Sequence, residues 1–438
     1  MPSAAGERNP ESAANWQNGA PAPAGPVDSQ PADMTPMKTS HGQRPLDGYR
    51  VLEMGQLLAG PFAASMLAYF GAEVIKIEPP GTGDPIRTWR VMKDGVSLWW
   101  HSLGRNKKSV TLDLRNPRGR ELARALALKS DILVENFRPG TLEKWGLGPA
   151  DLWQKNPGLI YGRISGYGQT GPYASKPGFA SVCEGLGGFR YVNGFPGEAP
   201  VRPNLSIGDT LAGIHCVIGI LLAAIQRSRD PAGRGQVIDA ALYESVFNLM
   251  EGVVPEYSGA GVVREPSGST LTGIVPTNTY RCKDGRFVII GGNGDSIYKR
   301  LMQAIGRPEL ADDPRMANNA GRVVHEKELD AAIGAWTGSM TAAGVLDVLA
   351  RAEVPSGPIY SVVDMLADPH FNARGLFEEV QVNGEALKIP AMLPFMSETP
   401  GRTDWPGPEV GAHNAEVLGE LLGFGPDQLA GLRNDGVI

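Results

Sequence analysis

The sequence is poor in the residues that build disulfide frameworks and zinc sites. Its 438 residues include three cysteines, Cys183, Cys216 and Cys282. Because they are odd in number, far apart and without a Cys-x-x-Cys pair, neither a disulfide framework nor a metal site is indicated. This usage of cysteine is typical of a reducing compartment, and we expect a cytoplasmic protein without a metal.

The chain also lacks an excess of positive charge and a long apolar run. Its net charge is −6, which leaves no electrostatic footprint for nucleic acid. The longest apolar run, residues 211–225, is interrupted by His215 and is shorter than the roughly 20 residues of a membrane-spanning helix. We therefore expect a buried helix there, and no nucleic-acid or membrane partner.

Nucleotide-binding fingerprints are missing as well. Gly55 and Gly60 are wrongly spaced for a Gly-x-Gly-x-x-Gly loop, and residues 104–109 lack the first glycine of a Walker loop. These absences exclude the usual dinucleotide-binding and nucleoside triphosphate-binding classes.

Strand and helix patterns alternate through the first half of the chain. The strands are expected at 49–55, 72–78, 107–114, 131–137 and 159–168, and the first two connecting helices at 60–71, with Phe62, Met66, Leu67 and Phe70 on one face, and at 116–130. Such alternation predicts an α/β fold with a Rossmann-like, mostly parallel sheet, which binds ligands at the carboxyl ends of its strands.

The domain organisation follows from composition and pattern. Residues 1–44 are rich in Ala, Pro, Gly and Ser without apolar periodicity, which is typical of a disordered tail. A large domain is expected over 45–255 and a loop-like linker over 256–277. A smaller α+β domain over 278–370 opens with a hairpin at 279–292, whose turn is Asp284-Gly285. Residues 371–438 are expected to return to the large domain.

Asp209 stands at the beginning of the long apolar helix. Two interpretations remain open from the residue alone: an N-cap of the helix, or a reacting carboxylate oriented by the helix terminus. Loops nearby in the chain carry cations and hydrogen-bonding groups that suit a ligand with phosphates, although a solvated surface explains any one of them. These residues are Arg105, Lys107, Lys108, Asn136, Arg138 and Lys144.

Eight segments, in order along the chain, resemble the family III CoA-transferases. They span 57–87, 106–120, 131–147, 164–173, 206–215, 233–245, 354–369 and 431–438. The resemblance runs from about Leu46 to the last residue. It implies transfer of CoA from an acyl-CoA to a carboxylic acid, a CoA thioester as substrate with no permanently bound cofactor, and an interlocked homodimer.

The resemblance also implies roles for individual residues. Asp209 matches the nucleophile, which attacks the thioester to form an aspartyl-acyl anhydride and then an aspartyl-CoA thioester. The segments that contact CoA in the family match Leu112, Arg115, Asn136, Phe137, Arg138 and Lys144. Arg202 and Arg163 are candidates to bind a second carboxylate, which would suit succinyl-CoA and a dicarboxylate acceptor.

Two alternatives belong to other functional classes: a CoA-binding protein without turnover, and an acyl-CoA racemase or epimerase like the isomerase branch of the superfamily. A racemase needs a second base, and Phe179 occupies the position of its histidine. Glu244, the counterpart of that histidine's partner, is then expected to be a buried structural group.

Many transferases have an acid where this chain has Ala180, and Glu184, one helical turn later, could replace it.

Overall fold

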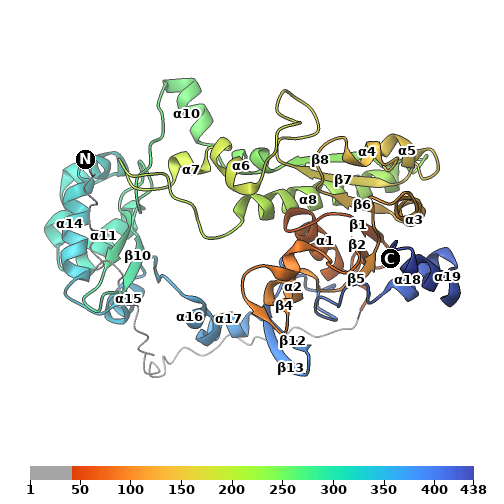
Figure 1. The fold of residues 1–438 in the computed structure, drawn as a ribbon. Coiled ribbons are helices and arrows are strands. Elements are labelled where there is room, and N and C mark those ends of the chain that lie inside the picture. Colours follow the sequence, from red (N-terminus) through yellow and green to blue (C-terminus); the bar gives the residue numbers. More distant parts are fainter. Residues whose placement is uncertain (1–41) are drawn as a thin grey trace, which may run out of the picture. The chain divides into compact units, whose positions relative to one another are not determined.

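The structure, a computed structural model that describes residues 42–438, contains a six-stranded parallel sheet (Figure 1). Most of the tail expected at 1–44 therefore lies outside the described residues. The strands are β1 (Arg50–Glu53), β2 (Glu73–Glu78), β5 (Lys107–Thr111), β6 (Ile132–Glu135), β7 (Ile160–Ser165) and β8 (Val237–Ala241). The α/β fold expected from the alternating pattern is confirmed, and all five expected strands are present.

The strand order is β5-β2-β1-β6-β7-β8, so the chain first winds outward from β1 in one direction and then in the other. The two directions meet between β1 and β6, where Val51 pairs with Ile132. In doubly wound sheets, ligands bind outside the carboxyl ends of the strands at this reversal. The fold thus predicts a site near the loops after β1 and β6.

Both faces of the sheet are covered, because successive residues of each strand point to opposite sides. Val51, Val74 and Ile132 pack into one buried cluster with α1 (Ala59–Tyr69) and α8 (Ile207–Arg229). Leu52 and Leu133 pack into the other cluster with α3 (Pro117–Ala127). The helix expected over 116–130 is present as α3, and its N-cap is Asn116, whose side chain accepts a hydrogen bond from the amide of Arg118 at 2.9 Å.

Helix α8 is the longest helix described, and it packs against α1, β7 and β8. Within residues 42–438, α8 is the only single helix whose length and composition would allow it to cross a bilayer. The bent pair formed by α14 (Glu326–Thr337) and α15 (Ala342–Arg351) passes the same test together. One face of α8 packs on the sheet, but Ile218, Leu222 and Ile225 are exposed, so the helix that the sequence predicted to be buried is buried on one side only.

The buried face of α1 differs in part from expectation. Leu67 is buried, but Phe62, Met66 and Phe70 are only half-buried. The deepest positions are small residues, Ala63, Ala64 and Ala68. The reason is the close approach of α8: a Cβ added at Gly213 would lie 2.9 Å from Cδ1 of Phe62.

The segment between β2 and β5 folds into elements that the periodicity did not indicate. They are η1 (Pro85–Thr88), β3 (Met92–Lys93), β4 (Val96–Ser97) and α2 (Leu98–Leu103). Trp100 of α2 is fully buried, and its indole N–H donates to the carbonyl of Pro408 at 2.9 Å. A contact with a residue so distant in sequence leaves no local pattern.

Further short helices follow β6, β7 and β8 along the chain. They are α4 (Thr141–Lys144), α5 (Pro149–Trp153), α6 (Ala180–Leu186), α7 (Phe189–Val192), α9 (Leu242–Phe247) and α10 (Val253–Ala260). Strand β8 leads directly into α9. The linker expected to be loop-like from 256 is wrong over its first residues, because α10 extends to Ala260.

A second, three-stranded antiparallel sheet is built from β9 (Thr277–Arg281), β10 (Phe287–Gly291) and β11 (Ser356–Pro358). The expected hairpin turn is confirmed, with Gly285 at a φ of +79° that favours glycine. The helices of this region are α11 (Asp295–Ala304), α12 (Pro308–Ala311), η2 (Pro314–Met316), α13 (Asn319–Val324), α14 (Glu326–Thr337), α15 (Ala342–Arg351), α16 (Val362–Ala367) and α17 (Pro369–Ala373).

The last part of the chain forms the hairpin β12 (Phe377–Val382) and β13 (Glu385–Pro390), then α18 (Asn414–Leu422) and α19 (Pro426–Asn434). Helix α18 lies beside the edge strand β5 (Figure 1). The Asn414 side chain accepts from the amide of Thr111 at 2.8 Å, and Val437 is buried in the cluster that contains α3. The domain boundaries proposed from the sequence stay a prediction.

Candidate active site

The N-termini of α1 and α8 lie side by side at the carboxyl edge of the sheet. Helix α1 follows β1 and α8 precedes β8, and both strands are parallel to their neighbours. Both helices are therefore antiparallel to the strands, and their N-termini lie at the strands' carboxyl ends. A Cβ added at Gly213 would lie 3.1 Å from the carbonyl oxygen of Ala59, the first residue of α1. The first turn of α8, with Asp209, therefore extends past the beginning of α1.

Asp209 is the third residue of α8 and is not its N-cap. The cap is Ser206, whose side chain makes no capping hydrogen bond. The capping interpretation of Asp209 is therefore wrong, because the helix begins earlier than the apolar pattern indicated. The Asp209 carboxylate is half-buried and accepts no hydrogen bond from the described residues. The positive end of the helix dipole therefore stabilises the charge of the carboxylate, and its oxygen lone pairs are free to react.

Two neighbours with opposite charges act on this carboxylate. Burial and the negative charge of Glu184 raise the pKa of Asp209 to about 6, and the positive charge of Arg202 opposes the rise. At neutral pH the group remains mainly ionised, which a carboxylate nucleophile requires.

Glu184 is a buried acid that contacts the N-terminus of α8. It is fully buried on α6, and its Oε1 accepts from the amide of Gly208 at 3.5 Å. Its Oε2 lies 3.3 Å from Nη2 of Arg190 and 3.5 Å from Nε of Arg202. The acid expected one turn after Ala180 thus lies against the beginning of α8. Arg190 was missed in the sequence, because a single arginine in a short helix carries no signal of its own.

Cys183, beside Glu184 on α6, was not singled out in the sequence either. Its thiol donates to the carbonyl of Gly166 at 3.3 Å. Burial, followed by the charges of Asp209 and Glu184, raises the pKa of this thiol to about 11. The thiol is therefore protonated at neutral pH and is no rival to Asp209 as a nucleophile.

The groups that a racemase would need are not assembled here. Phe179 is the N-cap of α6, 70% exposed, and has no proton to transfer. Glu244 is not the buried structural group expected, because it is exposed and accepts a hydrogen bond from the hydroxyl of Tyr243 at 3.0 Å. It lies on the outer side of α9, where a carboxylate is stable in water without a partner.

Two of the six expected CoA-contacting residues follow the edge strand β5. Leu112 is buried in the core, and its amide donates to the carbonyl of Glu78 at 2.9 Å. The side chain of Arg115 is 88% exposed and pairs with its neighbour Asp113 at 2.9 Å. Only Arg115 of these two presents a side chain to solvent.

The other four follow β6. Asn136 ties the loops at the sheet reversal together, because its side chain accepts from the amide of Gln56 and donates to the carbonyl of Gln56, both at 2.8 Å. Phe137 packs edge-on against Trp145, and Arg138 and Lys144 are exposed. Since β5 and β6 are three strand spacings apart, their loops are separated by about 14 Å, a span that suits a long ligand.

Three of the basic residues proposed to meet phosphates are instead engaged by other groups of the protein. The ammonium group of Lys107 is fully buried, 2.8 Å from Oε2 of Glu53. Arg105 is buried and donates to the carbonyl of Pro390 at 2.8 Å, and Lys108 pairs with two glutamates. The prediction for these three is wrong because Arg105 precedes β5 and Lys107 and Lys108 are its first two residues, so they lie at the amino end of the strand, opposite its carboxyl end.

Arg163 is also committed elsewhere. It is buried on β7, with Nε 2.7 Å from Oε1 of Glu135 and Nη1 2.6 Å from Oε1 of Glu143. A guanidinium with two carboxylates is already neutralised, so the idea that Arg163 receives a substrate carboxylate is wrong. Arg202 remains as the candidate.

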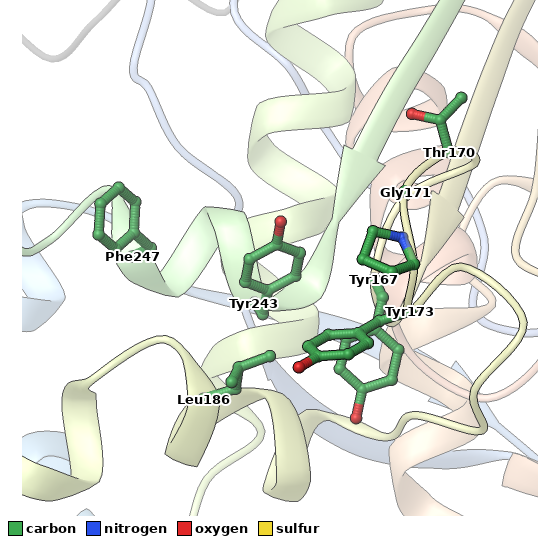
Figure 2. A pocket seen from close by; sticks show the side chains of 8 residues that line it. Tyr167, Thr170, Gly171, Tyr173, Leu186, Tyr243 and Phe247 are labelled. Atoms are coloured by element: carbon green, nitrogen blue, oxygen red, sulfur yellow. The ribbon is translucent and has the colours of Figure 1, made fainter.

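An aromatic cavity of about 330 Å³ opens beside the loop after β7, lined by Tyr167, Tyr173, Tyr243 and Phe247 (Figure 2). Leu186 of α6 also lines it. Leu186 and Glu184 are two residues apart, about 200° around a helix, so the cavity and the Glu184–Asp209 side are on different faces of α6. This cavity is therefore not the space around Asp209. Within residues 42–438, no group of His, Cys, Asp and Glu residues could hold a metal ion.

Comparison with known proteins identifies the family. The family model for CoA-transferase family III matches residues 46–414. The succinyl-CoA–D-citramalate CoA-transferase of Chloroflexus aurantiacus is 49% identical over 92% of this chain and 100% of its own. The alpha subunit of the succinyl-CoA–L-malate CoA-transferase of the same organism is 42% identical over 95% of this chain and 98% of its own.

Among solved structures, a CaiB/BaiF family protein from Brucella suis is similar, with a TM-score of 0.78 and 34% identity over 87% of this chain and 100% of its own. The match of sequence and fold along nearly the whole described chain agrees with the eight motifs. The chain therefore belongs to CoA-transferase family III and is a CoA-transferase that transfers CoA from an acyl-CoA to a carboxylic acid.

Proposed function

We propose that this CoA-transferase uses succinyl-CoA as donor and a small dicarboxylate as acceptor, with Asp209 as the nucleophile. The observation that carries the proposal is the half-buried Asp209 carboxylate, without a hydrogen-bond partner among the described residues, where α1 and α8 begin together. The names of the two similar transferases support the substrate class, since both pair succinyl-CoA with a dicarboxylate.

The proposed reaction has four balanced steps. An Asp209 oxygen attacks the thioester carbonyl, the C–S bond breaks, and an anhydride and CoA thiolate result. The thiolate then attacks the aspartyl carbonyl, which releases succinate and leaves an aspartyl-CoA thioester. The acceptor carboxylate attacks this thioester to form a new anhydride and thiolate. Finally, the thiolate attacks the acceptor's acyl carbonyl, giving the new CoA ester and free Asp209. The energy of the thioester is kept throughout if water is excluded.

Exposed cations at the carboxyl edge supply the proposed contacts for CoA. Arg138 and Lys144 follow β6, and Arg115 follows β5. Phosphates suit such cations and the amides of nearby helix starts. Leu112, Asn136 and Phe137 are proposed to shape the loops that present these charges, because their own side chains are engaged within the fold.

We also propose a cytoplasmic homodimer with interlocked chains. Helix α8 exposes a row of large apolar side chains, with Ile218 49%, Leu222 60% and Ile225 49% exposed. Spacings of three, four and seven residues place them on one face of the helix. An apolar face of this kind is typical of a surface covered by a partner, and one similar transferase is itself named as a subunit.

The covalent path is tested by incubating the protein with succinyl-CoA and hydroxylamine, then identifying modified peptides by mass spectrometry. A hydroxamate on Asp209 is expected, and Asp209→Ala should lose both the hydroxamate and the transfer of CoA. Full transfer activity in Asp209→Ala would refute the proposal. Incorporation of deuterium at the alpha carbon of an acyl-CoA without CoA transfer would indicate an isomerase instead.

The acceptor is found by a second experiment. A panel of mono- and dicarboxylic acids is incubated with succinyl-CoA, and the CoA esters formed are identified by mass. C4 and C5 dicarboxylates are expected to give the highest kcat/KM. Preference for monocarboxylates would contradict the proposed substrate class while leaving the assignment of Asp209 intact.

A further inference from the structure

Four charged side chains lie together at the N-terminus of α8: Asp209, Glu184, Arg190 and Arg202. Glu184 is at the centre, fully buried, with both arginines within 3.5 Å of its Oε2. Its other oxygen accepts from the amide that precedes Asp209. The cluster therefore ties two guanidinium groups to the peptide that carries the candidate nucleophile.

The two arginines differ in what they leave free. Arg190 donates a hydrogen bond to Glu184 at 3.3 Å, and its side chain is mostly buried. Arg202 touches Glu184 through Nε at 3.5 Å and makes no side-chain hydrogen bond to any of residues 42–438, while 45% of its side chain is exposed. Its two Nη groups are the cationic donors that this cluster offers to a ligand.

The charge of the cluster changes during the reaction. With Asp209 ionised, two carboxylates balance two guanidinium groups. Acylation of Asp209, or its conversion to a CoA thioester, removes one negative charge and leaves one guanidinium without a counter-charge. The cluster then carries a net positive charge, which attracts an anion.

Building on the function proposed above, we propose that Arg202 binds the non-reacting carboxylate of the succinyl group and of the dicarboxylate acceptor. The reacting carboxylate has to meet the Asp209 carbonyl, so a guanidinium held to one side of Asp209 is placed for the other end of a short diacid. The planar fork of arginine fits a carboxylate through two parallel hydrogen bonds. Glu184 is the positioning residue, since it holds Nε and leaves the Nη groups directed outward.

The test uses exchange of labelled succinate into succinyl-CoA, because succinate is both the product and a dicarboxylate. Arg202→Gln is expected to raise the KM for succinate about 10- to 100-fold, the range of a lost hydrogen bond to a charged group. Inhibition by monomethyl succinate, which has one free carboxylate, should change less than about threefold because its methyl ester makes no ion pair with Arg202. Arg202→Lys should fall between the two proteins.

Arg234→Gln is the matched control. Arg234 is exposed and pairs with Asp230 at the opposite end of α8, so its loss removes the same charge without touching the cluster. An unchanged KM for succinate in Arg202→Gln would overturn the inference. Equal weakening of succinate and monomethyl succinate would overturn it too, because Arg202 would then contact the reacting carboxylate.

Failure of this inference is distinguishable from failure of the proposed function. Arg202→Gln should still form the Asp209 hydroxamate when succinyl-CoA is raised to saturation, and circular dichroism should show native helix content. If the wild-type protein forms no hydroxamate, the nucleophile assignment fails whatever Arg202 does. If the wild-type protein forms it and the Arg202→Gln KM is normal, only the role of Arg202 fails.

Discussion

At the residue scale, Asp209 lies between a charge that opposes its ionisation and one that favours it. Burial and Glu184 raise its pKa to about 6, and Arg202 limits the rise. A higher pKa makes a carboxylate more basic and more nucleophilic, but it has to remain below the working pH. In the proposed reaction, the cluster thus sets both the protonation of Asp209 and its nucleophilicity.

The first prediction concerns pH. The rate of Asp209 acylation by succinyl-CoA should rise as the pH increases through about 6 and level off above neutrality, because the ionised carboxylate reacts. Glu184→Gln should move the midpoint to lower pH and Arg202→Gln to higher pH. Rapid-quench measurement of acyl-enzyme against pH checks both directions. A midpoint that does not move in Glu184→Gln would show that this carboxylate has no influence on Asp209.

The second prediction concerns stability. An acid whose folded pKa is raised binds more protons folded than unfolded, so stability falls as pH rises from its ordinary value of 3.8 through about 6. Asp209→Asn removes this cost and should stabilise the protein by about 1–3 kcal/mol at pH 7.5. The difference should shrink toward pH 4. Urea unfolding at the two pH values measures it, and equal stability at pH 7.5 would contradict the prediction.

At the element scale, the contact between α1 and α8 determines where Asp209 lies. Gly213 is one turn after Asp209, and its Cα faces Phe62 and Ala59 closely. Small residues on both helices allow this approach. A change in the packing of the two helices would therefore displace the first turn of α8, which carries Asp209.

The third prediction is that Gly213→Val destabilises the fold by about 1–3 kcal/mol, as overpacking usually does, and lowers kcat by displacing Asp209. Its added atoms would meet Cδ1 of Phe62 at 2.9 Å and the Ala59 carbonyl at 3.1 Å. Gly185→Ala on α6 is the control, because a Cβ there meets nothing within 4 Å. Thermal unfolding and steady-state kinetics measure the two effects. Normal kcat in Gly213→Val would separate helix packing from catalysis.

At the scale of the whole molecule, the exposed apolar face of α8 belongs to the same helix that carries Asp209 at its first turn. Exposing these large apolar side chains to water is energetically unfavourable. The proposed homodimer would cover this face, so that α8 would pack against the sheet on one side and against the partner chain on the other.

The fourth prediction follows from that face. Leu222→Asp combined with Ile225→Asp should give a monomer in sedimentation velocity, because two buried carboxylates are too costly to desolvate. The substituted side chains are exposed in the single chain, so helix content should remain native. Arg234→Gln again serves as the control. A dimer that persists in the double variant would exclude this face as the interface.

The alternating strands and the apolar helix could be predicted from the sequence, because periodicity acts over a few residues, whereas the catalytic role of Asp209 stays a prediction. The elements between β2 and β5 could not. The burial of Trp100 depends on Pro408, and the strands β3 and β4 are too short for a period. Likewise, the N-cap at Ser206 was missed because the continuous apolar run begins only after Asp209, at Leu211.

By itself the sequence determined the fold class and the family, because order and spacing along the chain carry that information. Only the tertiary structure decided which charges are free. Lys107 and Arg163 looked available, yet each is held by a glutamate from another strand, Glu53 or Glu135. Arg202 alone of the carboxylate-binding candidates remains beside Asp209 with open donors. The reason is physical: ion pairs form between segments distant in sequence, whereas periodicity records only the local backbone.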